Sequence, residues 1–347
     1  MKIKTVYMDI EEVLAQPVQQ HVYPKRPNIF FRMLLRAVSA PDLKATNFKY
    51  REFEMEKLGK KEPCLVLMNH SSFIDLKIAS TVLYPRPLNI VCTSDGFVGK
   101  ERLMRSLGCI PTRKFVTDTQ LVRDMMFALK KLKSSILMYP EASYTFDGTA
   151  TPLPAGLGKC VKLTGVPVVM IRTYGAFARD PLYNGLRLRK VDVSADISYI
   201  LSPEDIRTKT AEDINGILYE QFSFDNFKWQ QENNVKISEP FRAEGLNRVL
   251  YKCPHCGAEG SMESGGADIL CNACGKGYTL TEYGFMEAKE GKTEFPHIPD
   301  WYAWERDCVG QEILKGSYKL DVPVDIYMMV NTRKVYGIGE GRLTHGE

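Results

Sequence analysis

The chain has 347 residues, enough for one large domain or two to three smaller ones, and its 44% hydrophobic and 25% charged residues are those of an ordinary globular protein. Its net charge of +4 is mild, so it does not require a nucleic-acid partner and allows contact with an anionic membrane surface. No apolar run approaches the roughly 20 residues of a membrane span, and residues 1–10 lack a signal-peptide core, so we expect a cytoplasmic protein.

Residues 1–24 predict a polar lead-in with one short strand. Residues 29–38 then predict a helix with large apolar residues that ends before Pro41. Such a helix can lie in the membrane interface with its apolar side down, or it can pack on its own domain. Four cations that can reach lipid headgroups lie close by: Lys25, Arg26, Arg32 and Arg36.

Residues 64–68 form an unbroken apolar run with the length of a buried strand. Asn69 ends the run, and small polar residues after it begin a helix. His70 therefore lies just beyond a buried strand, where α/β proteins bind ligands.

His70 and Asp75 are five residues apart, so they would not share a face of one straight helix. With His70 in the turn and Asp75 in the first helical turn, the two side chains can meet. The carboxylate can then fix the imidazole tautomer and leave the other ring nitrogen free as a base. The alternative is a capping Asp beside a structural His.

Further strands and helices alternate after this turn, which predicts an α/β sheet covered by helices on both faces within a domain of residues 25–224. The predicted strands are 88–92, 109–110, 135–139 and 165–171, with more strands in 186–200, and the predicted helices are 99–107, 118–133, 156–164 and 203–222.

Two of these strand ends carry candidate binding residues. Arg113 and Lys114 can bind a phosphate, or they can be solvated surface charges. Glu141, before the small residues Ala142 and Ser143, can accept a hydrogen bond from a substrate hydroxyl, or it can order its own loop.

Four blocks together resemble the glycerolipid acyltransferases, the family of lysophosphatidic acid acyltransferase. They read Asn-His-x4-Asp at 69–75, Gly-Cys-Ile-Pro-Thr-Arg-Lys at 108–114, Tyr-Pro-Glu-Ala-Ser at 139–143 and Gly-Val-Pro-Val-Val at 165–169. The blocks follow the order of the family, and the resemblance covers residues 25–200.

The resemblance implies transfer of a fatty acyl group from acyl-CoA or acyl-carrier protein to a lysophospholipid such as 1-acylglycerol-3-phosphate, as in phospholipid biosynthesis. It makes His70 the general base and Asp75 its support, on a protein bound peripherally at the cytoplasmic face of a membrane. It also implies a set of substrate-binding residues: Asn69, Arg113, Lys114, Glu141, Ala142 and Ser143.

One departure from the family concerns the acceptor, because Tyr144 stands where the third block usually has an Arg. The acceptor headgroup is therefore left open. Two other functions also stay open: an acyl hydrolase or thioesterase on the same scaffold, and a non-enzymatic protein that binds a partner through its C-terminal part.

The C-terminal part changes composition after a predicted linker at 225–248. Two CxxC-Gly turns, 14 residues apart, predict a structural zinc ribbon at 249–284, because four thiolates close the coordination sphere. Acidic residues between the turns argue against nucleic-acid binding. Residues 285–347 are interpreted as a small β-rich segment that ends without a clear finish. The four expected zinc ligands are Cys253, Cys256, Cys271 and Cys274.

Overall fold

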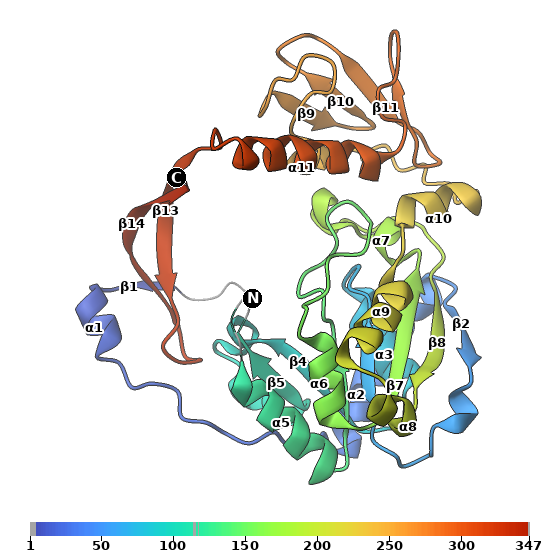
Figure 1. Cartoon of the computed structure of the whole chain (residues 1–347), viewed down its shortest axis with the longest axis vertical. Coiled ribbons are helices and arrows are strands. Elements are labelled where there is room, and N and C mark those ends of the chain that lie inside the picture. The colour runs from blue at the N-terminus through green and yellow to red at the C-terminus, as the bar shows by residue number, and fades with distance from the viewer. Residues whose placement is uncertain (1–4, 114–115, 117, 346–347) are drawn as a thin grey trace.

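Figure 1 shows the chain as a computed structural model, which describes residues 5–113, 116 and 118–345. An α/β domain forms the larger part, a small antiparallel sheet lies beyond it, and a third sheet joins the two ends of the chain. The predicted fold class, an α/β sheet followed by a β-rich C-terminal region, is confirmed.

The α/β domain is built on a seven-stranded sheet in the order β2-β8-β7-β3-β6-β4-β5. The five strands from β7 to β5 are parallel, whereas β8 runs antiparallel to β7 and β2 runs parallel to β8. The strands are β2 (Lys49–Phe53), β8 (Ser194–Leu201), β7 (Val168–Tyr174), β3 (Leu65–Met68), β6 (Ser135–Met138), β4 (Leu88–Thr93) and β5 (Cys109–Thr112).

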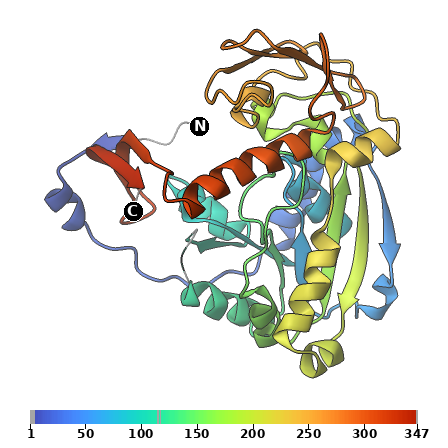
Figure 2. The ribbon, with the colours of Figure 1, turned by 45° about the horizontal axis from the view of Figure 1, so that its top comes forward.

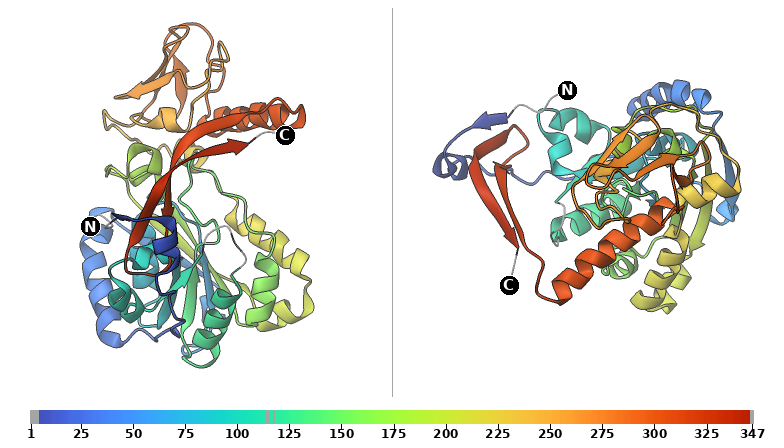
Figure 3. Two further views of the ribbon diagram at one scale, coloured as in Figure 1. Left: turned by 90° about the vertical axis from the view of Figure 1, so that its left-hand side faces the viewer. Right: turned by 90° about the horizontal axis from the view of Figure 1, so that it is seen from above.

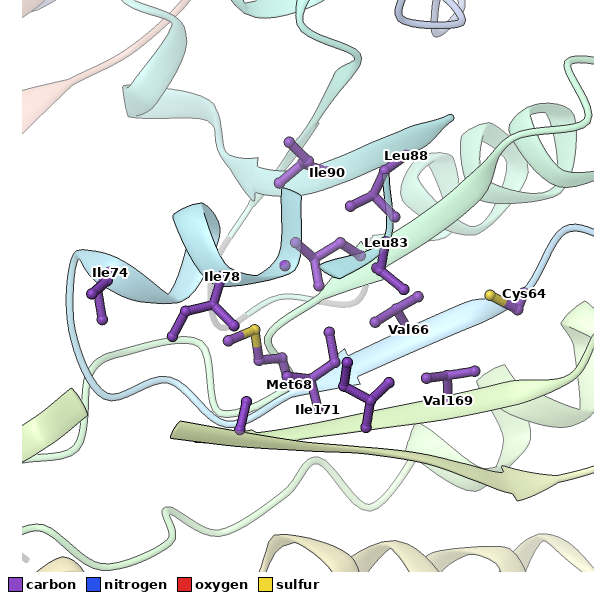
Figure 4. Close-up of a cluster of buried hydrophobic side chains, with 14 of the residues drawn as sticks. Cys64, Val66, Met68, Ile74, Ile78, Leu83, Leu88, Ile90, Val169 and Ile171 are labelled. Atoms are coloured by element: carbon purple, nitrogen blue, oxygen red, sulfur yellow. The ribbon is translucent and has the colours of Figure 1, made fainter. Parts of the chain in front are cut away.

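Helices cover both faces of this sheet because its central strands are apolar on both sides. In β3, Val66 and Met68 pack with one set of helices, and Leu65 and Leu67 pack with the other. Figure 4 shows the first cluster, in which Ile78 of the following helix lies beside Met68. The first face carries α2 (Ile29–Ala45), α3 (Ile74–Val82) and α4 (Glu101–Ser106), and the second carries α5 (Thr119–Lys130), α6 (Leu157–Thr164), α8 (Pro203–Thr208) and α9 (Ala211–Phe222).

Several element boundaries differ from the prediction. Helix α2 continues through Pro41, because Leu43 is buried in the core and the Thr46 hydroxyl donates to carbonyl groups of the last turn. The predicted helix at 203–222 is two helices, since Thr210 and Asp213 form a capping box that starts the second one. Of the predicted strands in 186–200, only β8 forms.

The predicted linker at 225–248 is ordered. It contains α10 (Asn226–Glu232) and a short 3-10 turn, and its apolar residues Phe227, Ile237 and Leu246 are buried. These contacts pack the segment against the residues on either side. The polar composition of the segment did not predict them.

Residues 249–314, which we call the cysteine module, follow this segment. The module contains a four-stranded antiparallel sheet and a 17-residue helix, α11, that the β-rich interpretation of the tail did not predict. The strands are β9 (Met262–Gly265), β10 (Asp268–Cys271), β11 (Gly277–Leu280) and β12 (Met286–Ala288), and the helix is α11 (Ile298–Leu314).

The cysteine module shares its core with the α/β domain. Phe177 of α7 (Ala176–Arg179) and Phe227 of α10 lie in the same apolar cluster as Tyr278 and Trp301 of the module. Figure 2 shows the module seated over the end of the domain that carries α7 and α10. The two parts therefore pack on each other through aromatic side chains.

The two ends of the chain meet in a third sheet. Strand β1 (Thr5–Tyr7), which precedes α1 (Ile10–Leu14), pairs in parallel with β14 (Val335–His345), and β13 (Leu320–Met328) pairs with β14 in antiparallel fashion. Figure 3 shows this sheet reaching from the end of α11 toward the α/β domain. At the turn of the hairpin, the Thr332 hydroxyl donates to Glu101 of α4 over 2.6 Å.

Candidate active site

His70 and Asp75 meet as the sequence predicts. His70 lies in the turn between β3 and α3, and its Nδ1 is 3.0 Å from Oδ2 of Asp75. The imidazole is partly exposed, whereas Asp75 is fully buried. Since a carboxylate accepts hydrogen bonds, Nδ1 carries the proton and Nε2 keeps its lone pair.

The backbone of the same turn holds Asp75 in place. Its Oδ2 also accepts hydrogen bonds from the backbone N–H groups of Ser71 (2.7 Å) and Ser72 (3.0 Å). These donors fix the orientation of the carboxylate at the N-terminal end of α3. Its other oxygen, Oδ1, has no hydrogen-bond partner among the described residues.

Glu141, in the loop after β6, is hydrogen-bonded to the turn that carries His70. One carboxylate oxygen accepts the backbone N–H of His70 and the other accepts that of Thr151, each over 2.8 Å. Burial raises the pKa of Glu141 to about 7, although these N–H groups and His70 act to lower it. The contacts hold the loop after β6 against the His70 turn.

Asn69 links β3 to β7. Its Oδ1 accepts hydrogen bonds from the backbone N–H (2.9 Å) and the hydroxyl (3.2 Å) of Thr173, and its Nδ2 donates to Ser71 over 3.2 Å. The side chain is buried, and its observed contacts position the turn that carries His70.

Ala142 and Ser143 continue the loop after Glu141. Ala142 is exposed and has a φ of 60°, in the left-handed region where a side chain costs energy. Gly would adopt this backbone conformation without that cost. Ser143 is partly exposed in the same loop.

Arg113, the described basic residue of the second block, lies apart from His70. Arg113 follows β5, three strands from β3, which separates the strand axes by about 14 Å. Its guanidinium is exposed, with Nε 3.8 Å from Asp118. Lys114 lies outside the described residues. A contact of Arg113 with a substrate would therefore fall far from the reacting atoms.

Two tyrosines contact the His70 imidazole, and neither was predicted as a site residue. The ring centroids of Tyr139 and Tyr144 each lie 4.2 Å from that of His70, at interplanar angles of 26° and 51°. Both rings therefore pack against the imidazole. Their positions in and beside the third block could have marked them as site residues. The sequence did not show that their rings pack on the imidazole.

A second buried carboxylate near the site was also missed. Asp180, at the end of α7, lies near Ser72, and burial raises its pKa to about 6. Its Oδ1 lies 3.1 Å from Nη1 of Arg179. No local motif marks Asp180, because only the fold brings α7 to the start of α3.

The four predicted cysteines gather in the module, with all four Sγ atoms within 4.8 Å of one another. The Cys253–Cys274 and Cys256–Cys271 Sγ pairs are 3.9 and 3.8 Å apart. A tetrahedral Zn²⁺ site with Zn–S bonds of about 2.3 Å requires S–S separations of about 3.8 Å, whereas a disulfide is about 2.05 Å long. The glycines that follow each turn, Gly257 and Gly275, have φ values of 76° and 78°, as tight turns require. The geometry fits a structural zinc ion.

Comparison with known proteins identifies the α/β domain. Residues 50–173 match the family model described as Acyltransferase, and they include His70, Asp75 and Glu141. This match supports the predicted resemblance to the acyltransferases for this segment of the chain.

A solved structure is also similar to the chain, namely the 1-acyl-sn-glycerophosphate (LPA) acyltransferase PlsC from Thermotoga maritima. The match has 15% sequence identity and a TM-score of 0.45, and it covers 55% of this chain and 76% of that one. No protein in the curated set matches the chain.

Proposed function

We propose that the α/β domain transfers a fatty acyl group from acyl-CoA or acyl-carrier protein to a hydroxyl group of a lysolipid, a step of lipid biosynthesis. The observation that carries this proposal is the His70–Asp75 pair, with Nδ1 held by a buried carboxylate at the end of β3. The match of residues 50–173 to the Acyltransferase family model supports it.

In this proposal His70 acts as the general base. Its Nε2 takes the proton of the acceptor hydroxyl as the oxygen attacks the thioester carbonyl carbon. The carbon–sulfur bond then breaks, and the leaving thiolate takes the proton back from the imidazolium. Asp75 stabilises the imidazolium through Nδ1. The chain contributes no covalent intermediate, because the hydroxyl attacks the donor directly.

The test is acyl transfer from labelled acyl-CoA and acyl-carrier protein to lysolipids, beginning with 1-acylglycerol-3-phosphate. His70→Ala should lower kcat by at least about 100-fold, because a positioned base contributes about 10²–10⁴-fold. Cys160→Ser, on α6, serves as a control and should retain full activity. Release of free fatty acid without transfer would instead identify a hydrolase, and activity that survives loss of His70 would contradict the proposal.

We also propose that the protein binds peripherally to the cytoplasmic face of a membrane through α2. No helix in the described ranges is long and apolar enough to cross a bilayer. Helix α2 buries one face against the domain and exposes the other, which is apolar. The predicted cations Arg32 and Arg36 contact Pro85 and Tyr84 of the protein itself. The exposed apolar residues are Ile29, Phe30, Met33, Leu34 and Val38.

Sedimentation with vesicles of anionic phospholipid tests the membrane proposal. Phe30→Asp should lower the bound fraction, because Phe30 is 63% exposed on the apolar face of α2. Leu188→Asp is the matched control, since Leu188 is 61% exposed on another segment. Equal binding of both variants would exclude α2 as the contact.

A further inference from the structure

Aromatic rings lie against the His70 imidazole. Tyr139 and Tyr144 are both partly exposed, and their rings pack against the imidazole ring. Phe73, which is 62% exposed, has its ring centroid 6.3 Å from that of Tyr144. A substrate that brings a hydroxyl to His70 therefore meets aromatic faces, which pack well against C–H groups.

Carboxylates lie close to Tyr144. Asp75 and Asp180 lie close enough to Tyr144 to raise its pKa, which burial and these carboxylates together bring to about 12. These carboxylates offer no attraction to an anionic group placed beside Tyr144, so such a group would need a cation that is not already paired.

The cations near these carboxylates already have anionic partners. Arg179 lies between Asp180, at 3.1 Å, and Asp42, at 3.6 Å. Lys77 on α3 also pairs with Asp42. These cations are therefore neutralised by the protein itself.

A phosphate monoester carries a charge of about −1.5 to −2 at neutral pH and needs cationic partners where it is removed from water. Glycerol and sugar headgroups carry no charge, expose C–H groups and hydrogen-bond through hydroxyls. We propose that the acceptor is a lysolipid with an uncharged glycerol or sugar headgroup, and that Tyr144 is the residue that selects against a phosphate monoester. This inference rests on the proposed acyl transfer and names the acceptor class of the same site.

The experiment compares kcat/KM for two acceptors that differ only in the phosphate, 1-acylglycerol and 1-acylglycerol-3-phosphate. The wild type should prefer 1-acylglycerol. Tyr144→Arg should shift the ratio toward the phosphate by about 10- to 100-fold, because a hydrogen bond to a charged group contributes about 1.5–3 kcal/mol. Tyr144→Phe keeps the ring and should keep the preference.

Phe146→Arg is the control for an added charge, because Phe146 is 49% exposed in the same loop and has no ring contact with His70 among the described residues. It should leave the ratio within about twofold of the wild type. A wild-type preference for the phosphate acceptor, or a ratio that Tyr144→Arg does not move, would overturn this inference alone. Free fatty acid as the only product would overturn the proposed function and this inference with it.

Discussion

The α/β domain and the cysteine module each bury a glutamate that accepts a backbone N–H from a distant segment. Glu141 follows β6 and accepts N–H groups from His70 and Thr151. Glu305 on α11 is fully buried and accepts the N–H of Lys252 over 2.8 Å through one oxygen, while its other oxygen has no partner among the described residues.

The cores around the two glutamates differ. The sheet of the α/β domain has apolar layers on both faces, so its packing does not depend on Glu141. The module has strands of three or four residues, and its core combines aromatic side chains with Cys253 and Cys271. Such a small core needs additional stabilisation, which a metal ion can supply.

Because the two cores differ, we infer that the two buried glutamates support different properties of the protein, namely its activity and its folding. Glu141 positions the turn of the candidate base, whereas Glu305 holds α11 against the segment next to Cys253. We therefore expect changes at Glu141 to affect activity most, and changes in the module to affect folding and metal content most.

The largest effect should follow removal of the metal. Cys271→Ser or a chelator should unfold the module, because metal binding contributes about 10 kcal/mol to the folding of small zinc modules. The α/β domain should retain a separate unfolding transition. Metal analysis and thermal unfolding followed by near-UV circular dichroism measure both.

Cys160→Ser is the matched control and should keep both the metal and the melting profile. A Cys271→Ser protein that keeps its metal and melts as the wild type does would contradict the structural role of the metal. If the α/β domain lost its unfolding transition together with the module, the two regions would not differ in their dependence on the metal.

An intermediate effect is expected from a pair of amide substitutions. In Glu141→Gln the amide NH₂ must face one of two backbone donors, which costs about 1–3 kcal/mol. A displaced His70 turn should lower kcat/KM by about 100-fold. In Glu305→Gln the amide oxygen can still accept from Lys252, and the pKa of Glu305, raised to about 8 by burial, keeps the carboxyl neutral at pH 7.

Glu305→Gln should therefore retain activity and change the free energy of unfolding by less than about 1 kcal/mol. Steady-state kinetics and urea unfolding of both variants make the comparison. If Glu305→Gln impaired acyl transfer more than Glu141→Gln did, the assignment of the two roles would be reversed.

The smallest effect concerns the pH dependence of stability. The native protein keeps the proton of Glu141 up to about pH 7, whereas the unfolded chain loses it near its ordinary value of 4.5. The native state thus binds more protons in this window, so its stability falls as the pH rises, by at most about 1.4 kcal/mol per unit.

Urea unfolding of the wild type and Glu141→Gln between pH 5.5 and 6.5 isolates this contribution. Asp180 and Glu305, whose pKa values are also raised, remain in both proteins and cancel in the difference. Identical slopes for the two proteins would show that Glu141 does not titrate in this window.

The sequence by itself determined the local parts of the site. An apolar run followed by Asn69 placed His70 at a strand end, and the five-residue spacing brought Asp75 to its Nδ1. The two CxxC-Gly turns likewise specified the cysteine cluster. These features depend on residues close in sequence, where backbone geometry limits the possible arrangements.

Only the tertiary structure decided which distant segments meet at the site. The order of the strands separates Arg113 from His70, and it brings Glu141 and Tyr144 from the loop after β6 to the imidazole. The same holds for β1, which pairs with β14 from the other end of the chain. Strand order and the packing of α7 and α11 arise from the burial of apolar surface across the whole molecule. No local sequence pattern specifies this arrangement.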